Sequence, residues 1–512
     1  MTNVLLIMTD QQRADSLGCC GNRNAVTPNL DALACRGAVL ANHFTPNQMC
    51  SPSRSTLFSG LFPRHHGLTR NGVSLPEDTR LLTHDLASCG YRVHGAGKFH
   101  FQPILASSEH AMPDSNAFWS LPKSESWNGP FFGFDSVDIV IGESAAVTEG
   151  GHYARWLETT SPEAVKLYLP ENALAPAPDD LDEVWKSAIP QNLHYNSWIT
   201  DRACDFLQHH NEDQPFFLFV SYPDPHHPFS PPEPWCDLVN PEDVPLPKNV
   251  PGELERMPDY ILQASRSECN APDKSGSYFD FLLDPGKARE QGFMQTTEHL
   301  SEPTIRQAIA HTHGMVAMID DCVGQILAKL EEKGLSDDTI VIFTSDHGEL
   351  LGDHGLIRKG PPPYVQLLQL PMIVAGPSIV AGERRQLTSH LDIRATILEL
   401  LEIEGDGGDG ISFAEILRDG TTAGRSRLFA EYHPRASMDR YNQSLLTHDW
   451  RLTVYPQRRD WGELFDRNTD PGEHHNLYFD PAFSTIKELL TAEIARDWPP
   501  SPDAGEQAIA VY

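Results

Sequence analysis

The chain has 512 residues, a formal net charge of −32 at pH 7 and 40% hydrophobic residues. This length exceeds what one compact core usually supports, so we expect two lobes with enough apolar side chains to fill both. The negative charge excludes a nucleic-acid-binding role, because phosphate backbones require a basic face. No stretch stays apolar for the roughly 18 residues of a membrane span, so no membrane partner is expected.

The chain runs from Met1 directly into an apolar stretch, Asn3 to Met8, which is bounded by Asp10. A basic flank and a small-residue cleavage site, the marks of a signal peptide, are missing, so we interpret the stretch as a buried strand. The nine cysteines are odd in number and show no framework spacing, which favours a reducing compartment. We therefore expect a cytoplasmic, bacterial protein.

Strand-like runs alternate with helical patterns through most of the chain. This alternation predicts an α/β fold built on a large, mostly parallel sheet with helices on both faces. Apolar residues recur at helical spacing from 305 to 333, and a buried strand is predicted at 339–343. Two more buried strands are predicted at 216–220 and 370–374, and another helix at 391–401.

The glycine-rich run 405–410 is predicted to separate two domains, a larger catalytic one at 1–404 and a smaller α+β lobe at 405–512. Strand-like runs at 443–455 and 463–466 belong to the second. The tail 499–512 has no core pattern, and it is the reason to expect a homo-oligomer, because such a tail can pack on a neighbouring subunit.

Two stretches, 104–189 and 230–299, are rich in Pro, Gly, Ser and aromatic residues. Their periodicity is weak, so we predict long loops over the carboxyl edge of the sheet, where substrate-specific elements commonly lie. Their aromatic side chains form either an apolar wall of the substrate site or core filler. The residues concerned are Trp119, Trp127, Phe131, Phe132, Tyr153 and Trp156.

Cys50 lies in the sequence Cys-Ser-Pro-Ser-Arg, at the predicted start of a two-turn helix that ends at Gly60. The proline suits the first turn, and Ser51 and Ser53 are predicted to cap it. Arg54 lies one turn further on the same side. The backbone N–H groups and helix dipole at this end suit an anion. Cys50 alone is more often an inert loop residue, so the interpretation depends on partners elsewhere.

Asp10 and the pair Asp346 and His347 each follow a predicted buried strand. Each is singly more often a turn or loop residue. Because parallel strands bring their carboxyl ends to one edge, we expect these three to share a divalent ion with Cys50. Two carboxylates and one imidazole form a softer site than an all-oxygen cage and a harder one than a zinc thiolate site. We expect one ion per subunit, Ca²⁺ ahead of Mn²⁺.

The order of these motifs resembles that of type I, formylglycine-dependent sulfatases of the alkaline-phosphatase superfamily. The motifs are Asp10, Cys50-Ser51-Pro52-Ser53-Arg54, Gly97-Lys98-Phe99-His100, Pro225-His226-His227-Pro228-Phe229, Ser345-Asp346-His347-Gly348 and Lys359-Gly360. Residues 463–466 and 470–477 also resemble the closing segment of the family. The resemblance covers most of the chain and implies an alkaline-phosphatase-like fold and the metal-dependent hydrolysis of aryl or alkyl sulfate monoesters.

The resemblance also implies a modification and a nucleophile. A separate formylglycine-generating enzyme would oxidise Cys50 to formylglycine (3-oxoalanine), whose hydrate attacks the sulfur of the sulfate ester and later expels sulfate. Arg54 and Lys98 are implied to neutralise the nucleophile and the sulfate oxygens.

The remaining roles are also implied by the resemblance. His100 would be the base that releases sulfate, and His226 with Lys359 would protonate or stabilise the leaving oxygen. Asn71 and Gln11 are expected to donate hydrogen bonds to the substrate. We interpret two further histidines as loop or core residues, namely His227 and His354.

Two features narrow the resemblance to one branch. The pair Asp10-Gln11 and His347 differ from the acidic pair and the asparagine of many sulfatases, and resemble choline sulfatases, some bacterial arylsulfatases and phosphonate monoester hydrolases. Lys98 and His100 favour a sulfatase, because the phosphonate group carries uncharged hydroxyl residues there. Two alternatives stay open: a phosphonate monoester or phosphodiester hydrolase on the same scaffold, and a non-catalytic metal-binding protein with unmodified Cys50.

Overall fold

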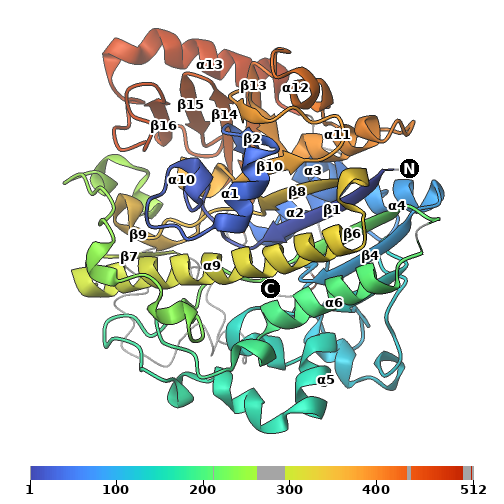
Figure 1. The fold of residues 1–512 in the computed structure, drawn as a ribbon. Coiled ribbons are helices and arrows are strands. Elements are labelled where there is room, and N and C mark those ends of the chain that lie inside the picture. The colour runs from blue at the N-terminus through green and yellow to red at the C-terminus, as the bar shows by residue number, and fades with distance from the viewer. Residues whose placement is uncertain (1, 212, 262–293, 435–439, 500–508, 510–512) are drawn as a thin grey trace.

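An eight-stranded sheet forms the centre of the computed structural model, which describes residues 2–211, 213–261, 294–434, 440–499 and 509 (Figure 1). The strand order is β11-β2-β10-β8-β1-β6-β4-β5. Their bounds are β1 Asn3–Thr9, β2 Ala38–Leu40, β4 Arg92–Gly97, β5 Ser136–Ile139, β6 Phe216–Ser221, β8 Thr339–Ser345, β10 Met372–Ala375 and β11 Gly382–Arg384. The predicted, mostly parallel sheet is confirmed, and β10 runs antiparallel to both its neighbours.

Helices cover both faces of this sheet, as the alternation predicts (Figure 1). The helices packed on one face are α1 (Pro28–Cys35), α6 (Tyr195–His209) and α9 (Glu302–Glu332), and those on the other are α2 (Cys50–Ser59), α4 (Leu82–Ser88) and α11 (Ile393–Leu400). The central strand β1 is apolar from Val4 to Met8 and fully buried, because side chains on both its faces meet a helix layer.

The C-terminal lobe is a four-stranded antiparallel sheet packed against one helix. Its elements are β13 (Arg427–Tyr432), β14 (Asn442–Thr447), β15 (Trp450–Val454), β16 (Gly462–Asp466) and α13 (Ser484–Asp497). The predicted α+β lobe is therefore confirmed, with the run 443–455 divided into two strands. The domain boundary at 404 stays a prediction, and most of the tail 499–512 lies outside the described residues.

Several short elements lie outside the two main sheets. They are β3 (His43–Phe44) with β12 (Thr388–Ser389), β7 (Met294–Thr296) with β9 (Leu356–Arg358), and the helices α3 (Pro63–His66), α10 (Val365–Leu368) and α12 (Ala414–Asp419). In the described part of the chain, no helix combines the length and the apolar character that a bilayer crossing requires.

The prediction of long loops at 104–189 and 230–299 is wrong in part. The first stretch contains the edge strand β5 and helix α5 (Gly151–Thr160), and much of the second lies outside the described residues. A four-residue strand between Pro and Gly residues leaves too little periodicity to be recognised. The aromatic residues of the first stretch pack against the two main hydrophobic clusters, so they are core filler.

Candidate active site

Two parallel strands bring the candidate carboxylates to one edge of the sheet. Strand β1 ends directly before Asp10 and its neighbour β8 ends directly before Asp346, with Thr9 and Ser345 paired in register. Asp346 N–H donates to the Thr9 carbonyl (3.1 Å). The Asp346 carboxylate in turn accepts the backbone N–H of Gln11 (3.0 Å). The predicted meeting of the strand ends therefore occurs, and backbone hydrogen bonds fix it.

Cys50 is the first residue of helix α2, as predicted. The predicted capping by Ser51 and Ser53 is wrong, because the N-cap residue is Met49 and it receives no side-chain cap. Ser53 Oγ instead donates to the Asp346 carbonyl at 2.5 Å. This buried hydrogen bond fixes the start of α2 against the end of β8.

Four potential metal ligands converge at this edge. Asp10, Cys50, Asp346 and His347 are fully buried, and their ligand atoms lie within 4.8 Å of one another. His347 Nδ1 donates to the Gly348 carbonyl (2.9 Å), so Nε2 faces Cys50 Sγ at 3.1 Å. Burial lowers the pKa of His347, but Asp346 raises it to about 10, so a cation must displace a proton. This donor set fits a divalent metal ion.

Buried cations surround the same carboxylates. Arg54 bridges them, with Nη2 3.1 Å from Asp10 Oδ2 and Nε 2.8 Å from Asp346 Oδ2. Lys98 Nζ lies 2.8 Å from Asp10 Oδ2 and 2.8 Å from Glu143 Oε2. Burial alone would raise the pKa of Asp10, but Lys98 and its neighbours hold it well below the usual range. Positive charge is thus concentrated here within a strongly acidic protein.

Lys359 joins the cysteine to the histidines. Its Nζ lies 2.9 Å from Cys50 Sγ, 2.9 Å from His347 Nε2 and 3.1 Å from His226 Nε2. His226 Nδ1 donates to the His227 carbonyl (2.5 Å), which leaves Nε2 to accept from the ammonium. Burial, and then Lys359, hold the pKa of His226 well below its ordinary value. Burial raises the pKa of the Cys50 thiol, but Lys359 and His347 bring it below its ordinary value.

His100 lies two residues beyond Lys98, in the segment that follows strand β4. It is 2% exposed and adopts a left-handed backbone conformation with φ 59°. Burial, and then the neighbouring charges of Lys98 and Arg54, lower its pKa well below the ordinary histidine value. His100 is therefore held as neutral imidazole, which is the form that can accept a proton.

The two predicted substrate-binding amides are both buried at the site. Gln11 Nε2 contacts His227 Nδ1 (2.8 Å) and Glu349, while its Oε1 has no hydrogen-bond partner among the described residues. Asn71 Oδ1 accepts from the backbone of Ser51 (3.3 Å), while its Nδ2 has no partner in the same part of the chain. Such buried polar atoms are ready to bind a ligand or water.

Sequence reasoning missed several residues that complete the site. Glu143 pairs with Lys98, and Ser221 Oγ accepts from Arg54 Nη1 (2.8 Å). Glu143 follows β5, so recognising that strand would have pointed to it. His227, interpreted as a loop or core residue, contacts Gln11 inside the site, whereas His354 lies in a separate cluster.

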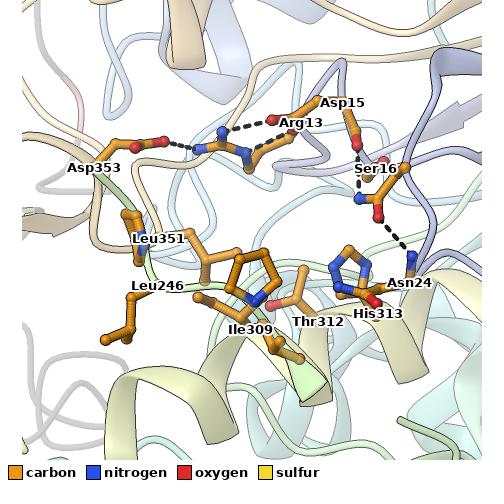
Figure 2. A pocket seen from close by; sticks show the side chains of 14 residues that line it. Arg13, Asp15, Ser16, Asn24, Leu246, Ile309, Thr312, His313, Leu351 and Asp353 are labelled. Atoms are coloured by element: carbon orange, nitrogen blue, oxygen red, sulfur yellow. Dashed lines mark hydrogen bonds and ion pairs between the residues drawn. The ribbon is translucent and has the colours of Figure 1, made fainter. Parts of the chain in front are cut away.

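A cavity of about 240 Å³ lies beside the loop that follows β1 (Figure 2). Arg13 borders it and lies between Asp15 and Asp353, with Nη1 2.7 Å from Asp353 Oδ2. The same guanidinium donates to the carbonyls of Glu349 (3.0 Å) and Leu350 (3.2 Å). Arg13 therefore anchors the beginning of the loop that leads to Lys359.

Comparisons with known proteins find matches along most of the chain. The profile of the Sulfatase family matches residues 2–403, and the profile described as N-sulphoglucosamine sulphohydrolase, C-terminal, matches residues 352–497. A multifunctional alkaline phosphatase superfamily protein, PehA, of Trinickia caryophylli is 30% identical, with 94% of this chain and 92% of that protein covered. An arylsulfatase of Clostridium perfringens is 25% identical, with 93% and 90% covered.

A solved structure shows the same fold. The phosphonate monoester hydrolase of Agrobacterium radiobacter superposes with a TM-score of 0.76 at 23% identity, covering 97% of this chain and 95% of that one.

Proposed function

Because the chain belongs to the sulfatase family, we propose that it hydrolyses aryl or alkyl sulfate monoesters to an alcohol and sulfate. A formylglycine made from Cys50 would be the nucleophile. The observation that carries this proposal is the position of Cys50 Sγ, 3.1 Å from His347 Nε2 and 2.9 Å from Lys359 Nζ, within the buried ligand cluster. A metal ion bound by this cluster and the Lys359 ammonium would both reach residue 50.

The donor set would hold one divalent ion, with Ca²⁺ ahead of Mn²⁺. The ligands would be Asp10, Asp346, His347 and residue 50. When bound, such an ion and a hydrated formylglycine supply Lewis acidity and an activated hydroxyl.

The surrounding side chains bind and orient the sulfate group. Arg54 and Lys98 are buried beside Asp10, where their charges offset the negative charge of the ester. Asn71 Nδ2 is a buried donor at the site with no partner among the described residues, so it would donate to a substrate oxygen. Exclusion of water strengthens each of these interactions.

Lys359 and His100 are the two groups proposed to move protons. Lys359 Nζ lies 2.9 Å from residue 50, and His226 Nε2, 3.1 Å away, orients it. Lys359 would therefore donate a proton, or hydrogen-bond, to the leaving oxygen. His100 is neutral because of burial and Lys98, so it would be the base that assists release of sulfate.

A second activity on phosphonate monoesters or phosphodiesters is the nearest alternative. The same cations and metal ligands would stabilise phosphoryl transfer, and a 30% identical relative is described as multifunctional. Lys98 and His100 favour sulfate, because the phosphonate group carries uncharged hydroxyl residues at these two positions. Lys98 Nζ lies at the site, 2.8 Å from Asp10 Oδ2.

The direct test compares kcat/KM for 4-nitrophenyl sulfate, phenyl phosphonate esters and bis(4-nitrophenyl) phosphate. The protein would be produced with a formylglycine-generating enzyme, its proposed maturation partner. We expect the sulfate ester to be hydrolysed fastest. A kcat/KM several orders of magnitude higher for the phosphonate would overturn the preference.

Mass spectrometry of the peptide Gln48 to Arg54 tests the modification separately. We expect a mass below that of the cysteine peptide and resistance to alkylation. An unmodified thiol in protein from its native host, together with no hydrolysis of any ester, would support a non-catalytic metal-binding protein instead.

A further inference from the structure

A second buried group of metal-ligating side chains lies apart from the candidate active site. Glu253, His354 and His474 are 3%, 1% and 5% exposed, and one ligand atom of each lies within 4.8 Å of the others. They come from the segment before the 3₁₀ turn Leu254–Arg256, from the loop after β8, and from the C-terminal lobe after β16. The fold therefore brings together two imidazoles and one carboxylate from distant parts of the chain.

The Glu253 carboxylate lies between the two rings. Its Oε1 contacts His354 Nδ1, and its Oε2 lies 3.2 Å from His474 Nδ1. A tetrahedral zinc ion with bonds of roughly 2.0–2.1 Å separates its ligand atoms by about 3.3 Å, so small shifts would accommodate one.

The contact at His354 Nε2, the ring nitrogen that faces away from Glu253, sets the tautomer of this histidine. Gln366 Nε2 donates to the Gly472 carbonyl (3.2 Å), which turns the amide oxygen toward His354 Nε2 at 3.1 Å. Nε2 therefore carries a hydrogen and donates it to Gln366. The lone pair of Nδ1 then points at the Glu253 carboxylate, and two acceptors in contact require a proton or a metal ion between them.

The cluster is held in place and lies in negative surroundings. The His354 ring stacks on Tyr364 with 3.8 Å between centroids and 10° between planes. Besides Glu253, the carboxylates Asp353 and Asp470 act on His474, and Asp353 also pairs with Arg13. A fixed imidazole ligand and nearby carboxylates both favour a divalent cation over an isolated ion pair.

We propose that Glu253, His354 and His474 bind a divalent transition-metal ion of the Zn²⁺ class, separate from the active-site metal. Both histidines would coordinate through Nδ1, and water would take the remaining position. Two imidazoles with one carboxylate form a ligand set that suits zinc. His354 lies five residues before Lys359, so the ion would join the C-terminal lobe to the loop that carries this lysine.

The test measures metal binding with the active-site cluster disabled. In the Cys50→Ala/Asp346→Asn background, metal-stripped protein is titrated with Zn²⁺ by calorimetry and with Co²⁺ by visible absorption. We expect one ion per chain and the absorption bands of tetrahedral cobalt. Adding His474→Gln should weaken Zn²⁺ binding at least about 100-fold, because a direct ligand is lost.

His475→Gln in the same background is the matched control, because His475 is the exposed neighbour of His474 and should leave binding unchanged. Glu253→Gln provides a second ligand variant, and the anomalous signal of zinc in crystals of the unmodified chain provides a measurement that needs no variant. Absence of zinc density at the cluster, or equal Zn²⁺ affinity of the His474→Gln and His475→Gln proteins, would overturn the proposal. Neither result depends on sulfatase activity.

Discussion

Two buried clusters combine carboxylates with imidazoles, and they differ in what surrounds them. The cluster at the strand ends contacts the side chains of Arg54, Lys98 and Lys359. At the cluster around Glu253, the carboxylates Asp353 and Asp470 act on His474, and Asp353 is itself paired with Arg13. We therefore expect the first arrangement to bind a metal ion and an anion together and the second to bind a cation alone.

The elements that form the clusters differ as well. The first is built on the ends of β1 and β8 and on the start of α2, where backbone geometry fixes each side chain. The second joins three loops and depends on tertiary packing for its shape. The two clusters have similar ligands, so we expect the cations around the first cluster to give it its catalytic character.

The largest expected effect comes from removing the proposed nucleophile. Cys50→Ala should lower kcat for 4-nitrophenyl sulfate by at least about 10⁴-fold, because no other group can take its place. The matched control is Cys89→Ala, since Cys89 is a free, exposed cysteine and its loss should leave kcat unchanged. If Cys50→Ala kept more than a tenth of the activity, the cluster at the strand ends would not be the catalytic one.

The next effect concerns the cation that joins the cysteine to the histidines. Lys359→Ala should lower kcat by roughly 10²–10³-fold, since a buried charge beside the reacting group is lost. Lys329→Ala, on the surface of α9, serves as the control. Steady-state kinetics with a leaving-group series provides the check, because the deficit should grow as the alcohol becomes a poorer leaving group. A uniform deficit would assign Lys359 a structural role.

A smaller effect is expected in the pH dependence. Lys98 disfavours the charged form of His100 and so lowers its pKa, and Lys98→Gln should raise that pKa. Because His100 would act in the release of sulfate, the acid limb of the kcat profile should then move to higher pH. The measurement is the pH–rate profile of the parent protein and of Lys98→Gln. A shift of the acid limb to lower pH would contradict the assignment of His100 as the base.

The smallest expected effect lies in the second cluster. In metal-free protein, His474→Gln should lower Tm by about 2 °C, because the contact with Glu253 is weakened. His475→Gln should leave Tm unchanged. Differential scanning calorimetry in the Cys50→Ala/Asp346→Asn background, with and without Zn²⁺, is the measurement, since Zn²⁺ should raise Tm of the control protein and not that of His474→Gln. An equal rise in both would place the ion elsewhere.

Much of the fold could be predicted because its central strands are buried on both faces. Such strands need continuous apolar runs, and the runs at 3–8, 216–220 and 339–343 correspond to β1, β6 and β8. The edge strand β5 could not be recognised, since it is short and lies among residues that favour turns. Glu143 was missed with it, although its carboxylate contacts Lys98.

The sequence by itself determined the family, the strand-end positions of Asp10 and Asp346, and the place of Cys50 at a helix start, because these follow from local order and periodicity. Tertiary structure alone decided which side chains satisfy one another. It placed Ser53 on the Asp346 carbonyl instead of its own helix, and it brought His474 to Glu253 across 221 positions of the chain. Contacts between distant loops leave no periodic pattern, so packing had to reveal them.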